Sequence, residues 1–260
     1  MLTIRTAFAV VASVLLATAT DDARAAKQGG GPDGEKRYRA CMQMVANDAP
    51  QALAQAQAWI KEGGDEPARH CAAAANIALG HYAEAAEALQ AMARKGGADA
   101  TSHPGLRASL WAQAAHAWLA ADRPAQAEAA AGEGARLLPG DAGLLVLRAR
   151  ARAEQNRLSE AYLDLDRAIG LDPSAADAYV FRASILRREG ALEPAAADLA
   201  KALALDPGQP EALLEQGIVR RMNGDEAGAR VEWQKLIAVA PKTPAAEAAR
   251  LNLEKLQKGD

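Results

Sequence analysis

Residues 171–207, LDPSAADAYVFRASILRREGALEPAAADLAKALALDP, contain two consecutive helical patterns that decide the fold. The apolar stripe of the first pattern is formed by Ala178, Tyr179, Ala183 and Leu186. The stripe of the second pattern is formed by Ala195, Leu199, Ala202 and Leu203. Gly190 ends the first helix and Pro207 ends the second. Because neither short helix can bury its stripe alone, the stretch predicts a helix pair that packs against neighbouring pairs.

The same pattern recurs along the chain with a period of 34 residues. The period is clearest in the prolines Pro139, Pro173, Pro207 and Pro241. Two further columns in the same phase contain Asn156, Gly190 and Gly224, and Leu165, Leu199 and Trp233. A fixed period of this length indicates a helical repeat protein.

Numbered in units that begin at residues 108, 142, 176 and 210, the chain resembles the tetratricopeptide repeat (TPR) family. The resemblance is carried by a large residue at position 4, small residues at 8, 20 and 27, and proline at 32. In the third unit these residues are Tyr179, Ala183, Ala195, Ala202 and Pro207. Departures occur at position 11, which holds Trp118, Arg152, Leu186 and Arg220, and at position 27 of the fourth unit, Leu236. The resemblance implies an all-α solenoid of stacked antiparallel helix pairs, wound as a right-handed superhelix.

The expected domain boundaries follow from this numbering and from the composition at the two ends. They are a signal peptide (1–25), a flexible linker (26–35), an N-terminal helix pair (36–65), a divergent TPR with an insertion (66–107), four TPRs (108–141, 142–175, 176–209 and 210–243) and a C-terminal capping helix (244–260). The pair at 36–65 is interpreted as a degenerate repeat or a cap. The insertion is expected within residues 94–105.

The amino terminus has the features of a targeting segment. A basic start is followed by the uncharged run AFAVVASVLLATA at residues 7–19, which is shorter than the roughly 20 apolar residues of a membrane span. Ala23 and Ala25 provide small residues for cleavage after Ala25, and Ala17 to Ala19 offers an alternative site. We therefore expect a bacterial protein exported in soluble form to the periplasm, with an uncleaved anchor as the alternative.

Composition excludes some classes of function. The chain is 50% hydrophobic and 24% charged with a net charge of −3, which argues against wholesale disorder and against a nucleic-acid binder. None of its four histidines has metal-ligand spacing, and the sequence contains no P-loop, dinucleotide fingerprint or GxSxG motif. We expect no catalytic residues, no metal and no cofactor.

The chain contains two cysteines, Cys41 and Cys71, and no CxxC motif. In an exported protein such a pair predicts a disulfide, which would join the N-terminal helix pair to the following repeat. The alternative is a pair of buried free thiols.

The TPR resemblance implies that first helices line a concave groove through positions 2, 5, 9, 12 and 13. The candidate partner-binding residues are Arg150, Ser184, Arg187, Arg188, Arg221 and His116. Arginines can hold carboxylates bidentately, so we expect a protein or peptide partner of acidic character, although arginine is also an ordinary solvated helix residue. The expected function is a non-enzymatic adaptor or assembly scaffold of the bacterial envelope. The alternatives are a small-ligand or glycan/peptide-binding periplasmic protein and a regulatory subunit of a cell-wall enzyme.

The cleavage signal leads to a direct prediction. The mature protein should begin near Ala26 and appear in the soluble exported fraction, because the apolar run is too short to anchor it. N-terminal sequencing of the fractionated protein measures this. A chain that keeps Met1 and sediments with membranes would contradict it.

Overall fold

The computed structural model describes residues 32–95 and 103–258. The expected signal peptide (1–25), part of the expected linker (26–31) and much of the expected insertion (96–102) lie outside the described residues. Within the described part, none of the helices combines the length and apolarity that crossing a bilayer requires.

The described residues form thirteen helices and no strand, in two compact units that meet in sequence between Gly140 and Asp141. The first unit contains α3 (Pro32–Asn47), α4 (Ala49–Lys61), α5 (Asp65–Ala78), α6 (Tyr82–Lys95), α7 (Pro104–Ala120) and α8 (Pro124–Leu137). The second contains α9 (Ala142–Glu154), α10 (Leu158–Leu171), α11 (Ala176–Arg188), α12 (Leu192–Leu205), α13 (Pro210–Met222), α14 (Glu226–Val239) and α15 (Pro244–Lys258).

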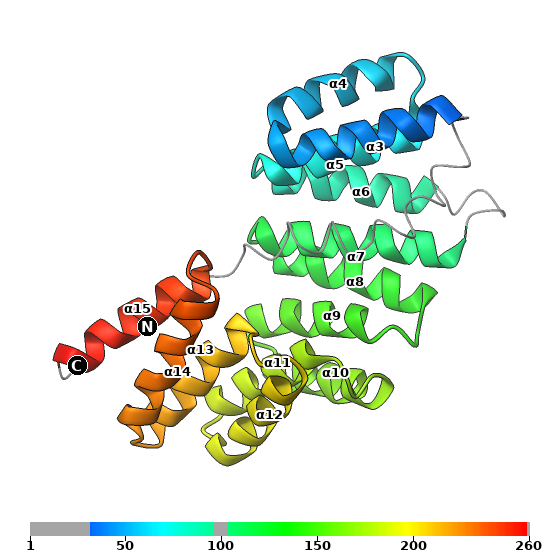
Figure 1. Ribbon diagram of the computed structural model, residues 1–260. Helices are drawn as coiled ribbons and strands as arrows, with labels where there is room; N and C mark the ends of the chain where they lie inside the picture. The colour runs from blue at the N-terminus through cyan, green and yellow to red at the C-terminus, as the bar shows by residue number, and fades with distance from the viewer. Residues whose placement is uncertain (1–31, 96–102, 259–260) are drawn as a thin grey trace. The chain divides into compact units, whose positions relative to one another are not determined.

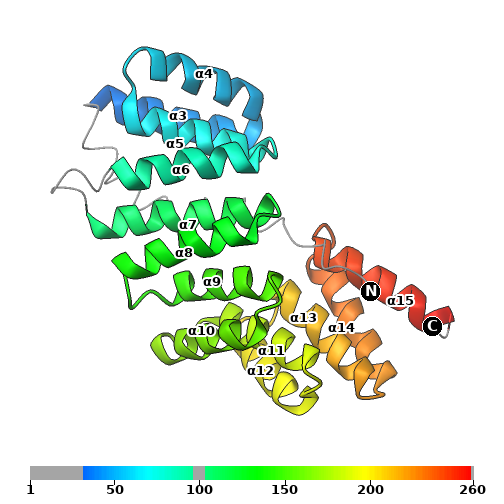
Figure 2. The same cartoon turned by 180° about the vertical axis from the view of Figure 1, so that it is seen from behind.

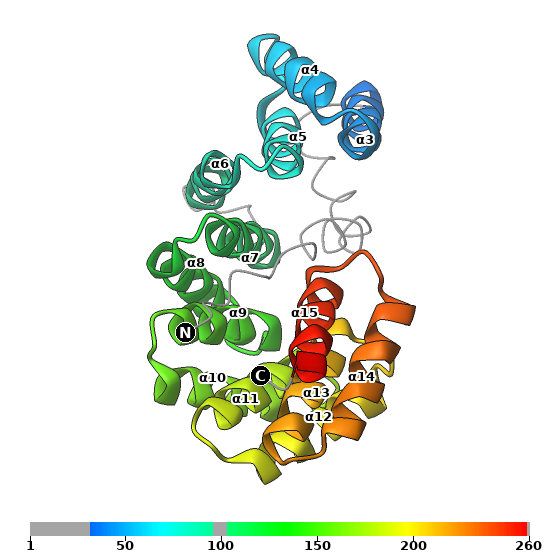
Figure 3. The ribbon, with the colours of Figure 1, turned by 90° about the vertical axis from the view of Figure 1, so that its left-hand side faces the viewer.

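Consecutive helices pack as antiparallel pairs in each unit (Figures 1 and 2). In the first unit, α5 and α7 lie in one layer and α6 and α8 in the other (Figure 3). In the second unit, the first helices α9, α11 and α13 contact one another in series, and each also packs against its own second helix. The predicted all-α architecture of stacked helix pairs is therefore confirmed.

The turn between the two helices of each repeat has one recurring backbone conformation. Position 15 has a positive φ in all five repeats, where the residues are Gly80, Asp122, Asn156, Gly190 and Gly224. Glycine adopts this left-handed conformation without strain, and Asn and Asp tolerate it better than other residues do. Position 15, which helped to reveal the period in the sequence, is thus the position at which the chain turns from the first helix to the second.

The N-terminal helix pair starts earlier than expected and differs from a repeat. Residues 32–35 were expected in the flexible linker, but α3 begins at Pro32 and includes Gly34. Proline is tolerated in a first helical turn, and the acidic Asp33 and Glu35 interact favourably with the helix dipole there. Helices α3 and α4 are separated by Asp48 alone, whose side chain caps α4, so the pair lacks the three-residue turn of the repeats.

The two ends of the segment 94–105, within which the insertion was expected, are helical. Helix α6 continues to Lys95, and α7 begins at Pro104, about one turn before the repeat numbering starts at 108. Proline again occupies a first turn, where its missing N–H has no intrahelical partner to lose. The first helix of this repeat therefore has 17 residues, compared with 13 in each of the three following repeats.

The two helices of a repeat meet where a small residue at position 8 faces a large one at position 24. In the third repeat of the sequence numbering these are Ala183 and Leu199, both fully buried. In the fourth they are Gly217 and Trp233, and a Cβ atom on Gly217 would lie 2.2 Å from Trp233 Nε1. The larger ring is therefore accommodated only because position 8 has lost its side chain. The Trp233 indole also donates a hydrogen bond of 3.2 Å to the Leu214 carbonyl.

This pairing predicts strong coupling between the two positions. Gly217→Ala should destabilise the protein by about 1–3 kcal/mol through overpacking, and Trp233→Leu by about 2 kcal/mol through loss of buried volume. The double variant restores the Ala–Leu pair of the preceding repeat, so it should be more stable than the sum of the single changes by at least about 1 kcal/mol. Urea unfolding measures all three variants.

A control glycine lies in the first unit. Gly132→Ala in α8 should not destabilise, because a Cβ atom there meets nothing within 4 Å and alanine favours the helix. Strict additivity of the Gly217 and Trp233 changes would show that the two residues do not constrain one another.

Candidate functional site

The first helices of the second unit provide the candidate binding surface. We call it the inner face, meaning the surface of α9, α11 and α13 that points away from α10, α12 and α14. Three of the expected groove residues, Ser184, Arg187 and Arg188, lie on α11, while Arg150 lies on α9 and Arg221 on α13. His116 is half-buried on α7 in the other unit, so the structure does not join it to this set.

Two of the expected arginines are already bound by groups of this chain. Arg187 holds Glu215 of α13 through two contacts, Nε to Oε2 at 2.6 Å and Nη2 to Oε1 at 3.2 Å. Both side chains are largely shielded, at 17% and 15% exposure. Arg188 donates to the Ala153 carbonyl at 3.3 Å and to Asn156 Oδ1 at 3.1 Å. These two guanidinium groups therefore tie α11 to its neighbouring repeats.

Arg150 lies at the centre of a mixed cluster. Its guanidinium is stacked over the ring of Phe181 at 4.8 Å from the ring centroid. Burial lowers the pKa of Arg150, whereas the charges of Glu154, Asp177 and Glu211 act in the opposite direction. The charges of three carboxylates therefore act on this one cation.

Asp177 and Glu211 are the acidic members of that cluster from α11 and α13. Burial raises the pKa of both carboxyl groups, and the Arg150 charge only partly opposes the change. The Asp177 side chain is nevertheless accessible to solvent. Gln209 Nε2 donates a hydrogen bond to Asp177 Oδ1.

Sequence reasoning missed two of these acids, although the signal was present. Glu211 occupies position 2 of its repeat, as Asp177 does, and Glu154 occupies position 13. Both would have been selected if the expected groove positions (2, 5, 9, 12 and 13) had been applied to every repeat. Ser184 and Arg221 are half-buried on the same helices, so all five predicted residues of this unit lie on first helices.

A second group of charges has a structural role inside each repeat. Arg148 binds the buried Asp164 through Nε and Nη2 at 2.8 and 2.6 Å. Arg182 binds the buried Asp198 in the same way, at 2.8 Å through each of these two nitrogens. Each pair joins position 7 of a first helix to position 23 of its second helix. The period of 34 residues, applied to charged residues, would have revealed both pairs.

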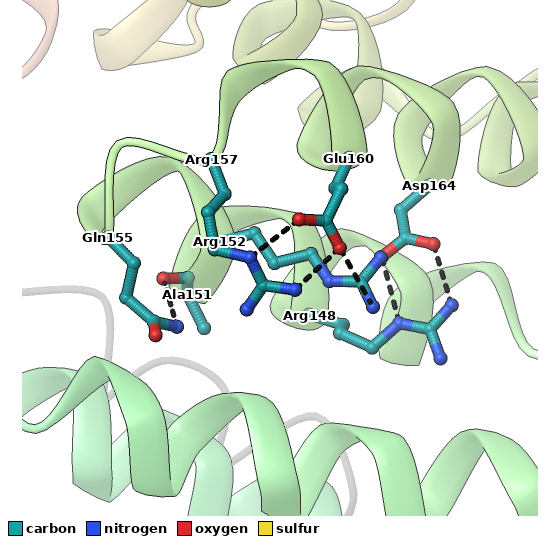
Figure 4. A network of polar contacts seen from close by, with 7 residues as sticks. All are labelled: Arg148, Ala151, Arg152, Gln155, Arg157, Glu160 and Asp164. Carbon is teal, nitrogen blue, oxygen red and sulfur yellow. Dashed lines mark hydrogen bonds and ion pairs between the residues drawn. The ribbon is translucent and has the colours of Figure 1, made fainter.

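The first of these pairs extends into a network that accounts for one departure from the TPR pattern (Figure 4). Arg152 occupies position 11 and donates to Asp164 Oδ2 at 2.9 Å, with Glu160 at 4.0 Å. Arg157 also contacts Glu160, through Nε at 2.6 Å. The second helix of this repeat therefore offers two carboxylates that bind the arginine at position 11.

The first unit contains a buried polar chain beside the two cysteines. His70 Nε2 lies 2.9 Å from Gln113 Oε1, so this nitrogen donates to the amide oxygen. His70 Nδ1 then accepts from the Tyr38 hydroxyl at 2.8 Å. This series of hydrogen bonds connects α3, α5 and α7. The adjacent Cys71 is joined to Cys41 by a disulfide, with Cα atoms 6.2 Å apart.

No group of three or more His, Cys, Asp or Glu side chains that could hold a metal ion occurs within residues 32–95 and 103–258.

Comparison with known proteins defines the class of fold. No protein-family model and no curated protein matches the chain. Among solved structures, MamA has a TM-score of 0.51 and 18% identity, covering 65% of this chain and 95% of that chain. Yeast Tom70 has a TM-score of 0.64 and 17% identity over 86% of this chain, which spans 47% of the Tom70 chain. YrrB, described as a TPR protein with an unusual peptide-binding site, has a TM-score of 0.47 at 17% identity, with coverages of 75% and 96%.

The helix pairs, the recurring turn and these similarities define a TPR fold. The predicted resemblance to TPR proteins is thereby confirmed. The exported bacterial type stays a prediction, since the amino-terminal residues that suggest it lie outside the described part.

The disulfide gives a prediction about stability. Reduction should lower the melting temperature of the first unit, because the bond closes a loop with a sequence separation of 30 residues. Such a loop corresponds to about 3–4 kcal/mol in the chain-entropy model, or about 15 °C for a unit of roughly 100 residues. Thermal unfolding with and without reductant measures the effect.

The control is the Cys41→Ala, Cys71→Ala double variant, whose melting temperature should not respond to reductant. Complete alkylation of both thiols in the purified, unreduced protein would contradict the predicted pairing.

Proposed function

We propose that this chain is a non-enzymatic protein-interaction module whose inner face binds an extended segment of a protein partner. The observation that carries the proposal is the continuous series of first helices α9, α11 and α13, which present charged and aromatic side chains on one surface. In such an array the apolar core holds the repeats together. The polar side chains on the inner face of the first helices are therefore available for recognition.

The contacts of Arg150, Arg187 and Arg188 refine the role expected for the arginines. Arg187 is bound by Glu215 and Arg188 by the preceding repeat, and Arg150 interacts electrostatically with three carboxylates. The inner face is therefore mixed in charge, and its predicted preference for an acidic partner receives little support from these contacts. We retain Arg150, Ser184, Arg187, Arg188 and Arg221 as proposed lining residues, with the ion-paired arginines shaping the surface.

We also propose that the protein works in the bacterial periplasm as an adaptor or assembly scaffold. The leader-like residues 1–25 and the Cys41–Cys71 disulfide support this location, because disulfides persist mainly in oxidising compartments. A glycan-binding role is less favoured. The aromatic ring of Phe181 on the inner face is covered by the Arg150 guanidinium, which would have to move before a sugar could stack there.

Blocking the inner face tests the proposal. Ser184 lies half-buried at the middle of α11, so Ser184→Trp should obstruct an extended ligand and lower partner affinity at least about tenfold, as loss of a central contact does. Leu163 is 66% exposed on the second helix α10, and Leu163→Trp is the matched control that should bind normally. Crosslinking in intact cells followed by mass spectrometry identifies the partner, and calorimetry measures its affinity.

Both variants should retain wild-type helicity and melting temperature. If Ser184→Trp binds as tightly as wild type while Leu163→Trp loses the partner, the second helices carry the interaction and the proposal is wrong.

A further inference from the structure

We infer that the inner face recognises a cationic group, a lysine or arginine side chain of the bound segment, at a subsite formed by Asp177, Gln209 and Glu211. This inference rests on the proposed function, because it names the chemistry of the ligand at the same surface. It also reverses the charge that the sequence alone suggested for the partner.

The arrangement of carboxylates is the first support. Asp177 and Glu211 occupy position 2 of consecutive repeats, and their charges interact with one another. Asp206 adds a further negative charge beside Asp177. Arg150 interacts with both Asp177 and Glu211, but it also interacts with Glu154. One guanidinium is thus shared among three carboxylates, and the local charge remains negative.

Gln209 is the second and independent support. Its side chain is buried, with 6% of the residue exposed, and its Nε2 donates to Asp177. Its Oε1 has no hydrogen-bond partner in the described structure. A buried acceptor left without a donor is unfavourable. The carboxylate oxygens of Asp177, which lie next to the Gln209 amide, are acceptors as well and cannot supply the donor. The missing component is therefore a hydrogen-bond donor. Because the Gln209 oxygen is buried and its partner Asp177 is exposed, we place the approach of a ligand at Asp177.

The electrostatic environment favours a positive donor. Burial disfavours the charged forms of Asp177 and Glu211 and so raises the pKa of each, and the Arg150 charge opposes this only in part. A ligand cation would stabilise both carboxylates, whereas a ligand carboxylate would add to the repulsion. Their place in the first turns of α11 and α13 favours negative charge only modestly.

The geometry favours a side chain of an extended segment. Asp177 and Glu211 belong to first helices that contact one another, so a segment that crosses both repeats meets both carboxylates. A guanidinium carries five N–H donors and an ammonium three, enough to serve two carboxylates and the Gln209 oxygen together. Long flexible stems also allow such a group to reach a partly enclosed site from the backbone of the ligand.

Selection from a random dodecapeptide phage library on the purified, oxidised protein tests the inference. Wild-type protein should enrich peptides containing lysine or arginine. The best such peptide, made synthetically, should bind the Asp177→Asn, Glu211→Gln double variant at least about tenfold more weakly, as loss of close charge pairs does, and its affinity should fall with added salt. Both substitutions keep the size of the side chain, and the amide oxygen introduced by Asp177→Asn would still accept the hydrogen bond from Gln209.

The matched control is the Glu193→Gln, Glu226→Gln double variant. It removes the same charge from the first turns of the second helices α12 and α14, where both residues are exposed. This control should bind like wild type, and equal losses in the two double variants would mean that only net charge matters, which overturns the subsite.

The Ser184→Trp variant separates the two proposals. If selection enriches acidic or uncharged peptides that Ser184→Trp no longer binds, the inner face is a binding surface but the cationic subsite is wrong. If the enriched peptides bind Ser184→Trp as well as wild type, the inner face is not the binding surface and the proposed function fails together with the inference.

Discussion

The close approach of the two helices within each repeat is the constraint on which the rest of the structure depends. Fully buried alanines such as Ala183, Ala195 and Ala202 allow the helix backbones to come together, and a large residue at position 24 fills the remaining space. This contact fixes which side of each first helix is buried. The opposite side is then left to form the inner face, so the composition of the core determines where recognition can take place.

Much of the fold could be predicted from the sequence because it repeats. The proline period, the small residues and the column containing Gly190 and Gly224 specify two helices, a left-handed turn and a phase. The ends of the array were harder to predict because no repeat imposes a phase there. Gly34 suggested a linker, yet proline and acidic residues around it start a helix at Pro32. Likewise, α7 gains about one turn before residue 108 because Pro104 can begin a helix.

The candidate site could be located from the sequence but its charge could not be evaluated. The groove columns selected Arg187 correctly as a first-helix residue, yet its partner Glu215 lies one repeat further along the chain. Whether the charge of an arginine is neutralised depends on such contacts between repeats. The sequence pattern of one repeat carries no information about them. Contacts within a repeat have the same effect on Arg148 and Arg182. Each of them forms an ion pair with a buried aspartate of its own second helix.

The distribution of ion pairs distinguishes structural charge from charge that can serve recognition. Asp164 and Asp198 are buried, and each accepts two contacts from one guanidinium, so their charges are matched within the repeat. Asp177 and Glu211 are also partly enclosed, but burial raises their pKa values and one arginine is divided among several acids. Charges that stabilise a fold are normally satisfied within it, because an unmatched buried charge costs free energy. Asp177 and Glu211 share the Arg150 charge with Glu154, so they are the carboxylates that a ligand cation is best placed to neutralise.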